Sequence, residues 1–403
     1  MKQILFVDDE LRVLQGLQRQ LHSMGNTWQV NFVSSGSQAL EFMGTVPVDV
    51  LVTDLKMPGM DGAQLLMEVQ KRYPATVRLV LSGHAESEMV LRLVGPAHQF
   101  MTKPCDPQEL RDAISRSFAV RDLLANEHLK RLAAQVNSLP TLPSLYIQLV
   151  KELRKPDTDI DRISEIVSQD IGMTSKILQL VNSAFFGLPQ PISRTAEAVQ
   201  YLGLNTMRDL VLCLQVFSQF EQKVSPDCSL QELFQHSYQT ADLARKIAIA
   251  ENCDSIFQDQ CFLAGMLHDV GKLVLAAGMP QQYARAVHTA RKLKVTLLEA
   301  EHAEYGATHA EVGGYLLGLW GLLGPVVEAV ALHHRPKDAL SRGFSPVIAV
   351  HVADIFANGL AVSRKEWPGN EIDNTCLAKL NLTERLAIWK ADFSGSSALA
   401  VAS

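Results

Sequence analysis

Residues 51–62 read LVTDLKMPGMDG, in which a short apolar run ends in an aspartate and is followed by a proline–glycine turn. Similar apolar runs occur before and after this stretch, and amphipathic segments with helical spacing lie between them. The expected strands are residues 4–7, 29–33, 48–52, 77–81 and 99–101, and clear helical patterns cover residues 11–24 and 63–72. Strands that alternate with helices in this way predict an α/β doubly wound domain with a five-stranded parallel sheet.

Acidic residues lie where ligands of such a domain bind, at the carboxyl ends of the strands. Asp8 and Asp9 directly follow the first expected strand, and Asp54 follows the third. Three clustered carboxylates repel one another, and a hard divalent cation such as Mg²⁺ relieves the repulsion and leaves sites open for phosphate. At the same edge, Ser82 can donate a hydrogen bond to a phosphoryl oxygen and Lys103 can pair with its charge. Positioning and charge neutralisation are what phosphoryl transfer chiefly needs.

The order of these elements resembles the receiver domain of response regulators. The resemblance rests on DDE at residues 8–10, LVTDLKMPGMDG at 51–62, LSG at 81–83 and KP at 103–104, and it covers residues 1–119. It implies that Asp54 accepts a phosphoryl group from a sensor histidine kinase or a phosphotransfer protein. The other implied roles are Mg²⁺ ligands for Asp8, Asp9, Asp54 and the backbone carbonyl of Lys56, a switch pair for Ser82 and Phe100, and a phosphate partner for Lys103.

A continuous, charged helical pattern follows, from about residue 107 to residue 136. We expect the last receiver helix to run on into a linker helix over residues 120–137. A homodimer that forms through this helix is one interpretation, although the apolar positions do not hold a clean heptad phase.

Two prolines in SLPTLPS, residues 138–144, end this helical pattern. The rest of the chain shows helix after helix, without a convincing strand. The sequence therefore predicts an all-α helical output domain over residues 138–340. A helical C-terminal extension is expected over residues 341–403, and its last ten residues, SGSSALAVAS, form a frayed tail.

Histidines and aspartates recur at wide intervals in this second domain. The set that could hold a pair of metal ions comprises His236, His268, Asp269, His309, His333 and Asp354. Imidazole and carboxylate ligands suit Fe, Mn or Zn. The accessory residues are Glu232, which shares a helix face with His236, Lys272, one turn after His268, and His334. The alternative is that these polar residues only stabilise a helical bundle. Lys272 could bind a phosphate ligand or simply pair with Asp269.

The spacing resembles the HD superfamily of metal-dependent phosphohydrolases, and longer segments narrow the resemblance to the HDOD domain, an HD-related output domain, over residues 139–335. These segments are LPTLPSL at 139–145, SQDIGMTSKILQLVNSAFFG at 168–187, ISRTAEAVQYLGLNTMRDLVL at 192–212 and EYGATHAEVGGYLLGLW at 304–320. The resemblance implies a non-catalytic signalling or scaffold module, whereas the related HD-GYP proteins hydrolyse cyclic di-GMP. After LHH at 332–334 the chain reads RPKDALSRGF, where the hydrolases carry an acidic residue and a GYP element.

Two functions follow from these resemblances. In the first, phosphorylation of Asp54 alters the face formed by Ser82 and Phe100, and so controls a non-catalytic helical module that binds an unidentified downstream protein. In the second, the helical domain is a phosphorylation-regulated, metal-dependent HD-type phosphodiesterase that acts on a cyclic mono- or dinucleotide. A DNA-binding output is disfavoured, because the net charge is −6 and no segment reads as a basic recognition helix.

The composition is typical of an intracellular globular protein. No uninterrupted apolar run reaches the length of a membrane span, and the opening MKQILFVDDE is too acidic for a signal peptide. The six cysteines are scattered without a paired motif, which suits reduced thiols. We therefore expect a cytoplasmic protein without a membrane partner.

Overall fold

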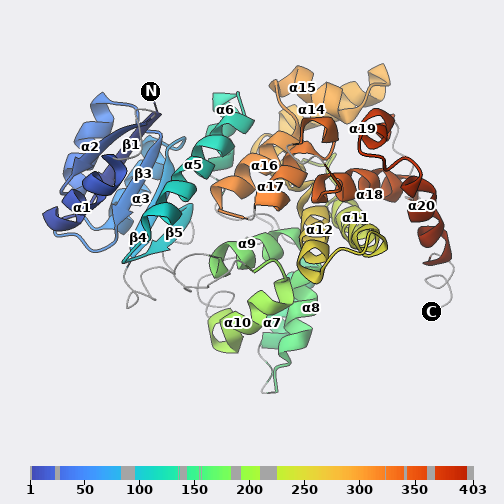
Figure 1. Ribbon diagram of the computed structural model, residues 1–403, viewed down its shortest axis with the longest axis horizontal. Coiled ribbons are helices and arrows are strands. Elements are labelled where there is room, and N and C mark those ends of the chain that lie inside the picture. Colours follow the sequence, from blue (N-terminus) through green and yellow to red (C-terminus); the bar gives the residue numbers. More distant parts are fainter. Residues whose placement is uncertain are drawn as a thin grey trace.

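The computed structural model shows an α/β part followed by a helical part (Figure 1). The residues that it describes are 2–22, 28–82, 96–134, 136, 143–153, 155, 157–182, 192–208, 225–322, 324–339, 343–360 and 368–396. Within these ranges every strand precedes residue 103, and the later elements are helices. The predicted fold class of both parts is confirmed.

The N-terminal part is built on one parallel sheet. Its strands are β1 Lys2–Val7, β2 Trp28–Val33, β3 Val50–Asp54, β4 Val77–Ser82 and β5 Gln99–Thr102. Their order across the sheet is β2-β1-β3-β4-β5, and every neighbouring pair is parallel. The central strand β3 is buried at every position, as expected of a strand that is covered on both faces.

Helices flank the sheet, and the turns that lead into them follow the carboxyl ends of its strands. They are α1 Leu11–His22, α2 Gly36–Thr45, α3 Gly62–Arg72 and α5 Pro107–Leu123. Asp61 begins α3 with a capping box, because its side chain accepts from the backbone of Gln64 and the Gln64 side chain reaches back. The cap therefore fixes the turn between β3 and α3, directly after Asp54.

The remainder of the described chain is helical, and α7 to α10 form a group beside the larger set of helices that follows (Figure 1). The elements are α6 Glu127–Ala134, α7 Pro143–Leu153, α8 Ile160–Ser168, α9 Ile171–Val181, α10 Thr195–Arg208, α11 Leu230–Ala250, α12 Ser255–Leu267, α13 Val270–Gly278, α14 Pro280–Leu293, α15 Leu297–Tyr305, α16 His309–Leu319, α17 Gly324–Leu332, the 3-10 helix Pro336–Asp338, α18 Pro346–Leu360, α19 Asn374–Lys379 and α20 Arg385–Ser396.

The linker differs from the sequence prediction, which was wrong in expecting one continuous helix. Helix α5 ends at Leu123 and α6 begins at Glu127. The Oδ1 atom of Asn126 accepts from the backbone N–H groups of His128 and Leu129, at 2.9 and 3.2 Å, and so caps the new helix. Apolar residues keep helical spacing across the break, so periodicity alone could not reveal it. Helix α6 then packs on α13 and α16 of its own chain.

Hydrogen bonds join the α/β part to the helical part. The Nε2 atom of Gln99, at the start of β5, donates to the carbonyl oxygens of Gly318 and Leu319 at 3.4 and 3.2 Å. The Nδ2 atom of Asn126 donates to the carbonyl oxygen of Tyr305 at 2.6 Å. The sheet edge therefore contacts the C-terminal end of α16, and the linker contacts the C-terminal end of α15.

Among the described residues, one helical stretch, Ser255–Gly278, is long and apolar enough to cross a membrane by length and composition. It spans α12 and α13, and 78% of its most apolar window is buried inside the protein. A buried core helix passes the same test, and the burial fits that assignment.

Candidate functional site

The sheet brings the predicted acidic residues to one edge. Asp8 follows β1, Asp54 ends β3 and Lys103 follows β5. Carboxylate oxygens of Asp8, Asp9 and Asp54 lie within 4.8 Å of one another. The Nζ atom of Lys103 lies 2.7 Å from Asp8 Oδ2 and 2.5 Å from Asp54 Oδ1. Lys103 thus bridges two of the three carboxylates.

The electrostatics of this pocket suit a hard cation. Burial raises the pKa of Asp54, although the hydrogen bond and charge of Lys103 oppose the rise. Burial lowers the pKa of Lys103, but hydrogen bonds to Asp54 and Asp8 outweigh burial and raise it. Three carboxylates share one ammonium group, which leaves excess negative charge on oxygen ligands that lie close together. The three carboxylates therefore fit Mg²⁺. Coordination of the ion by the backbone carbonyl of Lys56 stays a prediction.

Two predicted receiver residues can be placed only by their backbone. Ser82 ends β4 and Phe100 lies in β5, next to the strand end that carries Lys103. Their side chains lie outside the described residues, so their role as a switch pair stays a prediction. Gly62, which sequence reasoning missed, starts α3 so close to β3 that a Cβ atom there would overlap the carbonyl oxygen of Asp54.

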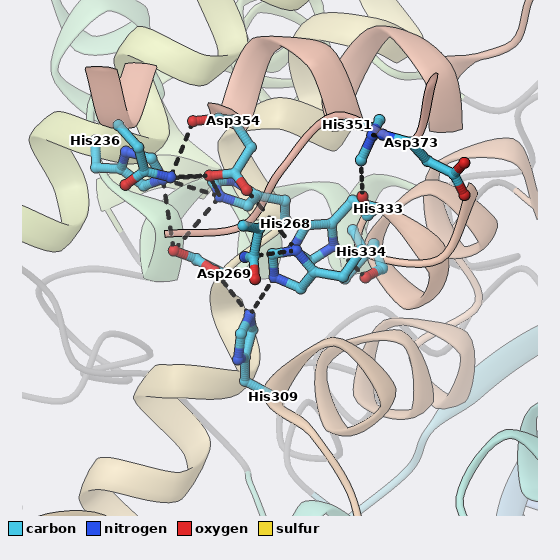
Figure 2. Close-up of polar contacts among 12 residues, drawn as sticks. His236, His268, Asp269, His309, His333, His334, His351, Asp354 and Asp373 are labelled. Carbon is cyan, nitrogen blue, oxygen red and sulfur yellow. Dashed lines mark hydrogen bonds and ion pairs between the residues drawn. The ribbon is translucent and has the colours of Figure 1, made fainter. Parts of the chain in front are cut away.

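The predicted metal-binding residues of the helical part come together (Figure 2). His236 lies in α11, His268 and Asp269 lie between α12 and α13, and His309 begins α16. His333 and the accessory residue His334 follow α17, and Asp354 lies in α18. The Nε2 atom of His236 lies 3.0 Å from Asp354 Oδ1, although the two residues are 118 positions apart. We call these seven residues the HD cluster. Its candidate ligand atoms form overlapping groups within 4.8 Å.

The imidazole rings turn the same nitrogen toward the middle of the HD cluster. The Nε2 atom of His268 lies 3.2 Å from Nε2 of His236, and Nε2 of His309 lies 3.1 Å from Nε2 of His334. Asp269 lies among these atoms, with Oδ2 3.4 Å from His268 Nε2 and Oδ1 3.2 Å from His309 Nε2. Imidazole nitrogens this close are favourable only with a proton or a metal ion between them, because two lone pairs repel.

Hydrogen bonds on the outer side of three rings decide which nitrogen faces inward. The Nδ1 atoms of His268 and His333 each donate to the backbone carbonyl oxygen three residues earlier, at 2.7 and 2.8 Å. The Nδ1 atom of His309 donates to Glu301 Oε2 at 2.7 Å. A neutral ring protonated at Nδ1 has its lone pair on Nε2, which is the form that binds a metal. Within the described part of the chain, His333 Nε2 is buried without a hydrogen-bond partner.

The accessory residues have different surroundings. The Nδ1 atom of His334 accepts from Asn370 Nδ2 at 3.1 Å, and its Nε2 atom lies 3.1 Å from Nε2 of His309. The Nζ atom of Lys272 lies 2.6 Å from Asp269 Oδ2, which confirms the predicted ion pair. Glu232 lines a cavity of about 280 Å³ beside His236.

Similarity to known proteins identifies both parts. The family model of the response regulator receiver domain matches residues 4–115, and that of the HDOD domain matches residues 139–336. The chain is a response regulator with an HDOD domain. The predicted pairing of a receiver with an HDOD output domain is confirmed.

Three known proteins show how far the similarity extends. An uncharacterized protein of Treponema pallidum is 26% identical over 242 residues, which cover 59% of this chain and 46% of that protein. The sensor kinase CckA of Brucella abortus is 35% identical over 122 residues, which cover 30% of this chain and 13% of the kinase. The solved structure of the MmoQ response regulator of Methylococcus capsulatus, 21% identical with a TM-score of 0.48, covers 62% of this chain and 97% of that chain. The chain spans less than half the length of both curated relatives.

The HDOD site carries more buried negative charge than Lys272 balances. The carboxylates of Asp269, Asp354 and Glu301 are all buried. Burial lowers the pKa of His268, but the charges and hydrogen bonds of Asp269 and Asp354 outweigh burial and raise it to about 9. Burial also lowers the pKa of His309, but the net shift is upward, mainly because of the nearby charge of Glu301. Without a metal, a proton on His268 balances part of this negative charge. A divalent ion of Fe, Mn or Zn fits in its place.

We expect the HDOD domain to release protons when it binds a divalent metal ion near pH 7, with about one of them from His268. The pKa of His268 is raised to about 9, so its ring holds a proton at pH 7 that a metal must displace, and the raised pKa of His309 acts in the same direction. Because metal and protons compete, metal affinity should rise with pH up to the raised pKa values. Calorimetric titrations in buffers with different protonation enthalpies measure the number released. Binding without proton release, or an affinity that falls as pH rises, would contradict this charge balance.

Several supporting residues of the HDOD site were missed. The Nδ1 atom of His351 donates to the carbonyl oxygen of His333 at 2.7 Å, and its Nε2 atom accepts from the backbone of Asp373 at 3.0 Å (Figure 2). Asn358 Nδ2 donates to Asp354 Oδ1 at 2.8 Å. The available signal was spacing, since His351 and Asn358 lie one turn before and after Asp354 on α18.

Glu301 is the strongest of these supports, because it accepts from both the backbone N–H and Nδ1 of His309, at 2.9 and 2.7 Å. We expect Glu301→Gln to weaken metal binding about 10- to 100-fold, since it removes the charge that orients the ligand ring. Glu304→Gln is the matched control, because Glu304 lies on the same helix and pairs with Arg285 at the surface. Competition titration with a metal chelator measures both. Equal affinities in the two variants would disprove the orienting role.

Proposed function

We propose that this chain is a two-component response regulator in which phosphorylation of Asp54 controls an HDOD domain that holds a metal centre. The observation that carries the proposal is the convergence of histidine Nε2 atoms around Asp269 and Asp354. The proposed ligands are His236, His268, Asp269, His309, His333 and Asp354, and the metals that suit them are Fe, Mn or Zn. When bound, such a metal supplies Lewis-acid activation of water or of a phosphoryl oxygen.

In the receiver, we assign Asp54 as the phospho-acceptor, and Asp8, Asp9 and the Lys56 carbonyl as further ligands of Mg²⁺. Lys103 already contacts Asp54, so its ammonium group is in place to pair with a phosphoryl group on that residue. The proposed donor is a sensor histidine kinase or a phosphotransfer protein. The similarity of the receiver to part of a sensor kinase supports this partner.

A path of direct contacts supports control within one chain. Strand β5 ends next to Lys103, and Gln99 at its start donates to the last carbonyl oxygens of α16. Helix α16 begins at His309, a proposed metal ligand. A shift of β5 on phosphorylation would therefore move a helix that carries a metal ligand. Helix α6 packs on its own chain, so this mechanism does not require a homodimer through the linker.

Hydrogen exchange of residues 309–319 tests this control. Beryllofluoride with Mg²⁺ mimics the phosphorylated aspartate, and we expect it to change exchange in α16 of the wild type. Gln99→Ala should reduce the change, because it removes the side chain that contacts α16 but leaves the acidic pocket intact. If beryllofluoride binds the receiver and exchange in α16 stays the same, the proposed control is wrong.

The output of the HDOD domain has two candidates. In the first, it is a non-catalytic module that binds a downstream protein, and the metal centre stabilises the fold. In the second, it is a metal-dependent phosphodiesterase. The cavity beside the HD cluster favours the second candidate, because His236, Asp269 and Lys272 line it and can meet a ligand there.

A hydrolysis screen separates the two outputs. Metal-loaded protein is tested with Mn²⁺, Fe²⁺ or Mg²⁺ against cyclic mononucleotides, cyclic dinucleotides and nitrophenyl phosphate esters. Hydrolysis that disappears in a His268→Ala, Asp269→Ala double variant assigns the phosphodiesterase. A metal-loaded protein that hydrolyses none of these esters assigns the non-catalytic module.

A further inference from the structure

The cavity of about 280 Å³ beside the HD cluster is lined by groups that suit one kind of ligand. Lys272, whose side chain is 11% exposed, and Arg291 of α14, whose side chain is 41% exposed, both line it. Lys272 is held by Asp269 at 2.6 Å. Arg291 pairs with Asp227 at 3.3 Å, in a partly exposed pair. The cavity therefore has a fixed cation at its buried end and a cation with a replaceable partner nearer its mouth.

Other parts of the wall favour an ester over a bare phosphate ion. Leu233, Tyr283 and Leu297 provide apolar surface between the charged groups. Glu232 adds a carboxylate, which repels a free anion but accepts hydrogen bonds from the hydroxyl groups of a sugar. A ligand with a phosphate at one end and a hydroxylated, partly apolar body matches this arrangement.

The volume of the cavity suits a small ligand. Pockets for small molecules measure about 300 to 1,000 Å³, and this one lies just below that range. A cyclic dinucleotide contains two nucleotides and two phosphates, and it needs about twice the room and a second set of cations. The cavity offers one pair, Lys272 and Arg291.

We propose that this cavity is the substrate pocket of the HDOD domain and that it takes a phosphate ester no larger than a single nucleotide. This proposal rests on the metal centre proposed above. Arg291 binds the phosphate with its planar fork of N–H groups and releases Asp227, and Lys272 holds the buried end. Hydrolysis there consumes one water. The water oxygen bonds to phosphorus, the ester P–O bond breaks, and a water proton ends on the departing alcohol oxygen.

Binding of a matched pair of ligands tests the pocket. Calorimetry on the metal-loaded full chain compares guanosine 5′-monophosphate with cyclic di-GMP, which share base and sugar and differ in size. We expect the mononucleotide to bind and the cyclic dinucleotide to bind at least about 10-fold more weakly. Arg291→Ala should weaken mononucleotide binding about 10- to 100-fold. Arg285→Ala is the control, because Arg285 lies on the same helix and pairs with Glu304 instead.

The results that would contradict the proposal can be told apart. Equal binding of the two ligands removes the size limit, and equal effects of Arg291→Ala and Arg285→Ala remove the phosphate contact. Circular dichroism of the Arg291→Ala variant confirms that it is folded. If the protein contains metal but binds neither ligand, the pocket assignment fails and the metal centre stands. If purified protein contains no metal and takes up none, both fail together.

Discussion

We expect a Gly271→Ala variant to bind metal more weakly than the wild type. Its free energy of unfolding should fall by about 1 to 3 kcal/mol. Gly271 lies in α13 where it crosses α16, and a Cβ atom there would overlap the carbonyl oxygen of His309 and lie 2.8 Å from the backbone nitrogen of Gly313. Both obstacles are backbone atoms, which cannot rotate away as a side chain can. The helices would have to separate, and His309 would move away from Asp269.

Gly324→Ala is the matched control for this variant. Gly324 starts α17 in the same domain, and within the described part of the chain no atom beyond its chain neighbours and its own helix backbone lies within 4 Å of a Cβ built on it. Thermal unfolding and metal content are measured for both variants. If Gly271→Ala keeps the melting temperature and the metal of the control, the close contact of α13 with α16 does not position His309.

An Asp54→Asn variant is expected to form no acyl phosphate, whereas we expect acetyl phosphate and Mg²⁺ to phosphorylate the wild type. The amide keeps the shape of the side chain but lacks the carboxylate that we propose as the phospho-acceptor and Mg²⁺ ligand. It also removes one of the two carboxylates that hold Lys103. Phosphate-affinity electrophoresis and intact-protein mass spectrometry measure the product.

Asp61→Asn provides the control for phosphorylation. Asp61 lies seven residues after Asp54 in the same motif and caps α3, and asparagine caps helices equally well. This variant should be phosphorylated like the wild type. Phosphorylation of Asp54→Asn at the wild-type level would assign the phospho-acceptor to another residue.

The receiver was predictable from sequence because its site follows from strand order. Once one strand precedes Asp8, a second ends at Asp54 and a third precedes Lys103, a parallel sheet brings these residues to one edge. The third strand was placed two residues early, since it runs from Val50 to Asp54. Thr53 and Asp54 are polar but buried, so hydrophobicity alone ended the strand too soon.

The sequence predicted which residues belong to the HD cluster but not which of them contact one another. Motif resemblance identified His236 and Asp354, but only the packing of α11 on α18 shows that they touch. Glu301 and Gly271 act through contacts with His309, which follows Glu301 by eight residues and lies on a different helix from Gly271. Neither residue has a local sequence signal. The break in the linker was missed because an asparagine cap does not interrupt apolar periodicity.

We infer that the HDOD domain holds a metal, and elemental mass spectrometry of protein purified without chelator tests this most directly. The comparison is a His268→Ala, Asp269→Ala double variant prepared in the same way. We expect near-stoichiometric Fe, Mn or Zn in the wild type and its loss in the variant. Wild-type protein without any of these metals would contradict the claim and leave the seven residues as a proton-balanced hydrogen-bond network.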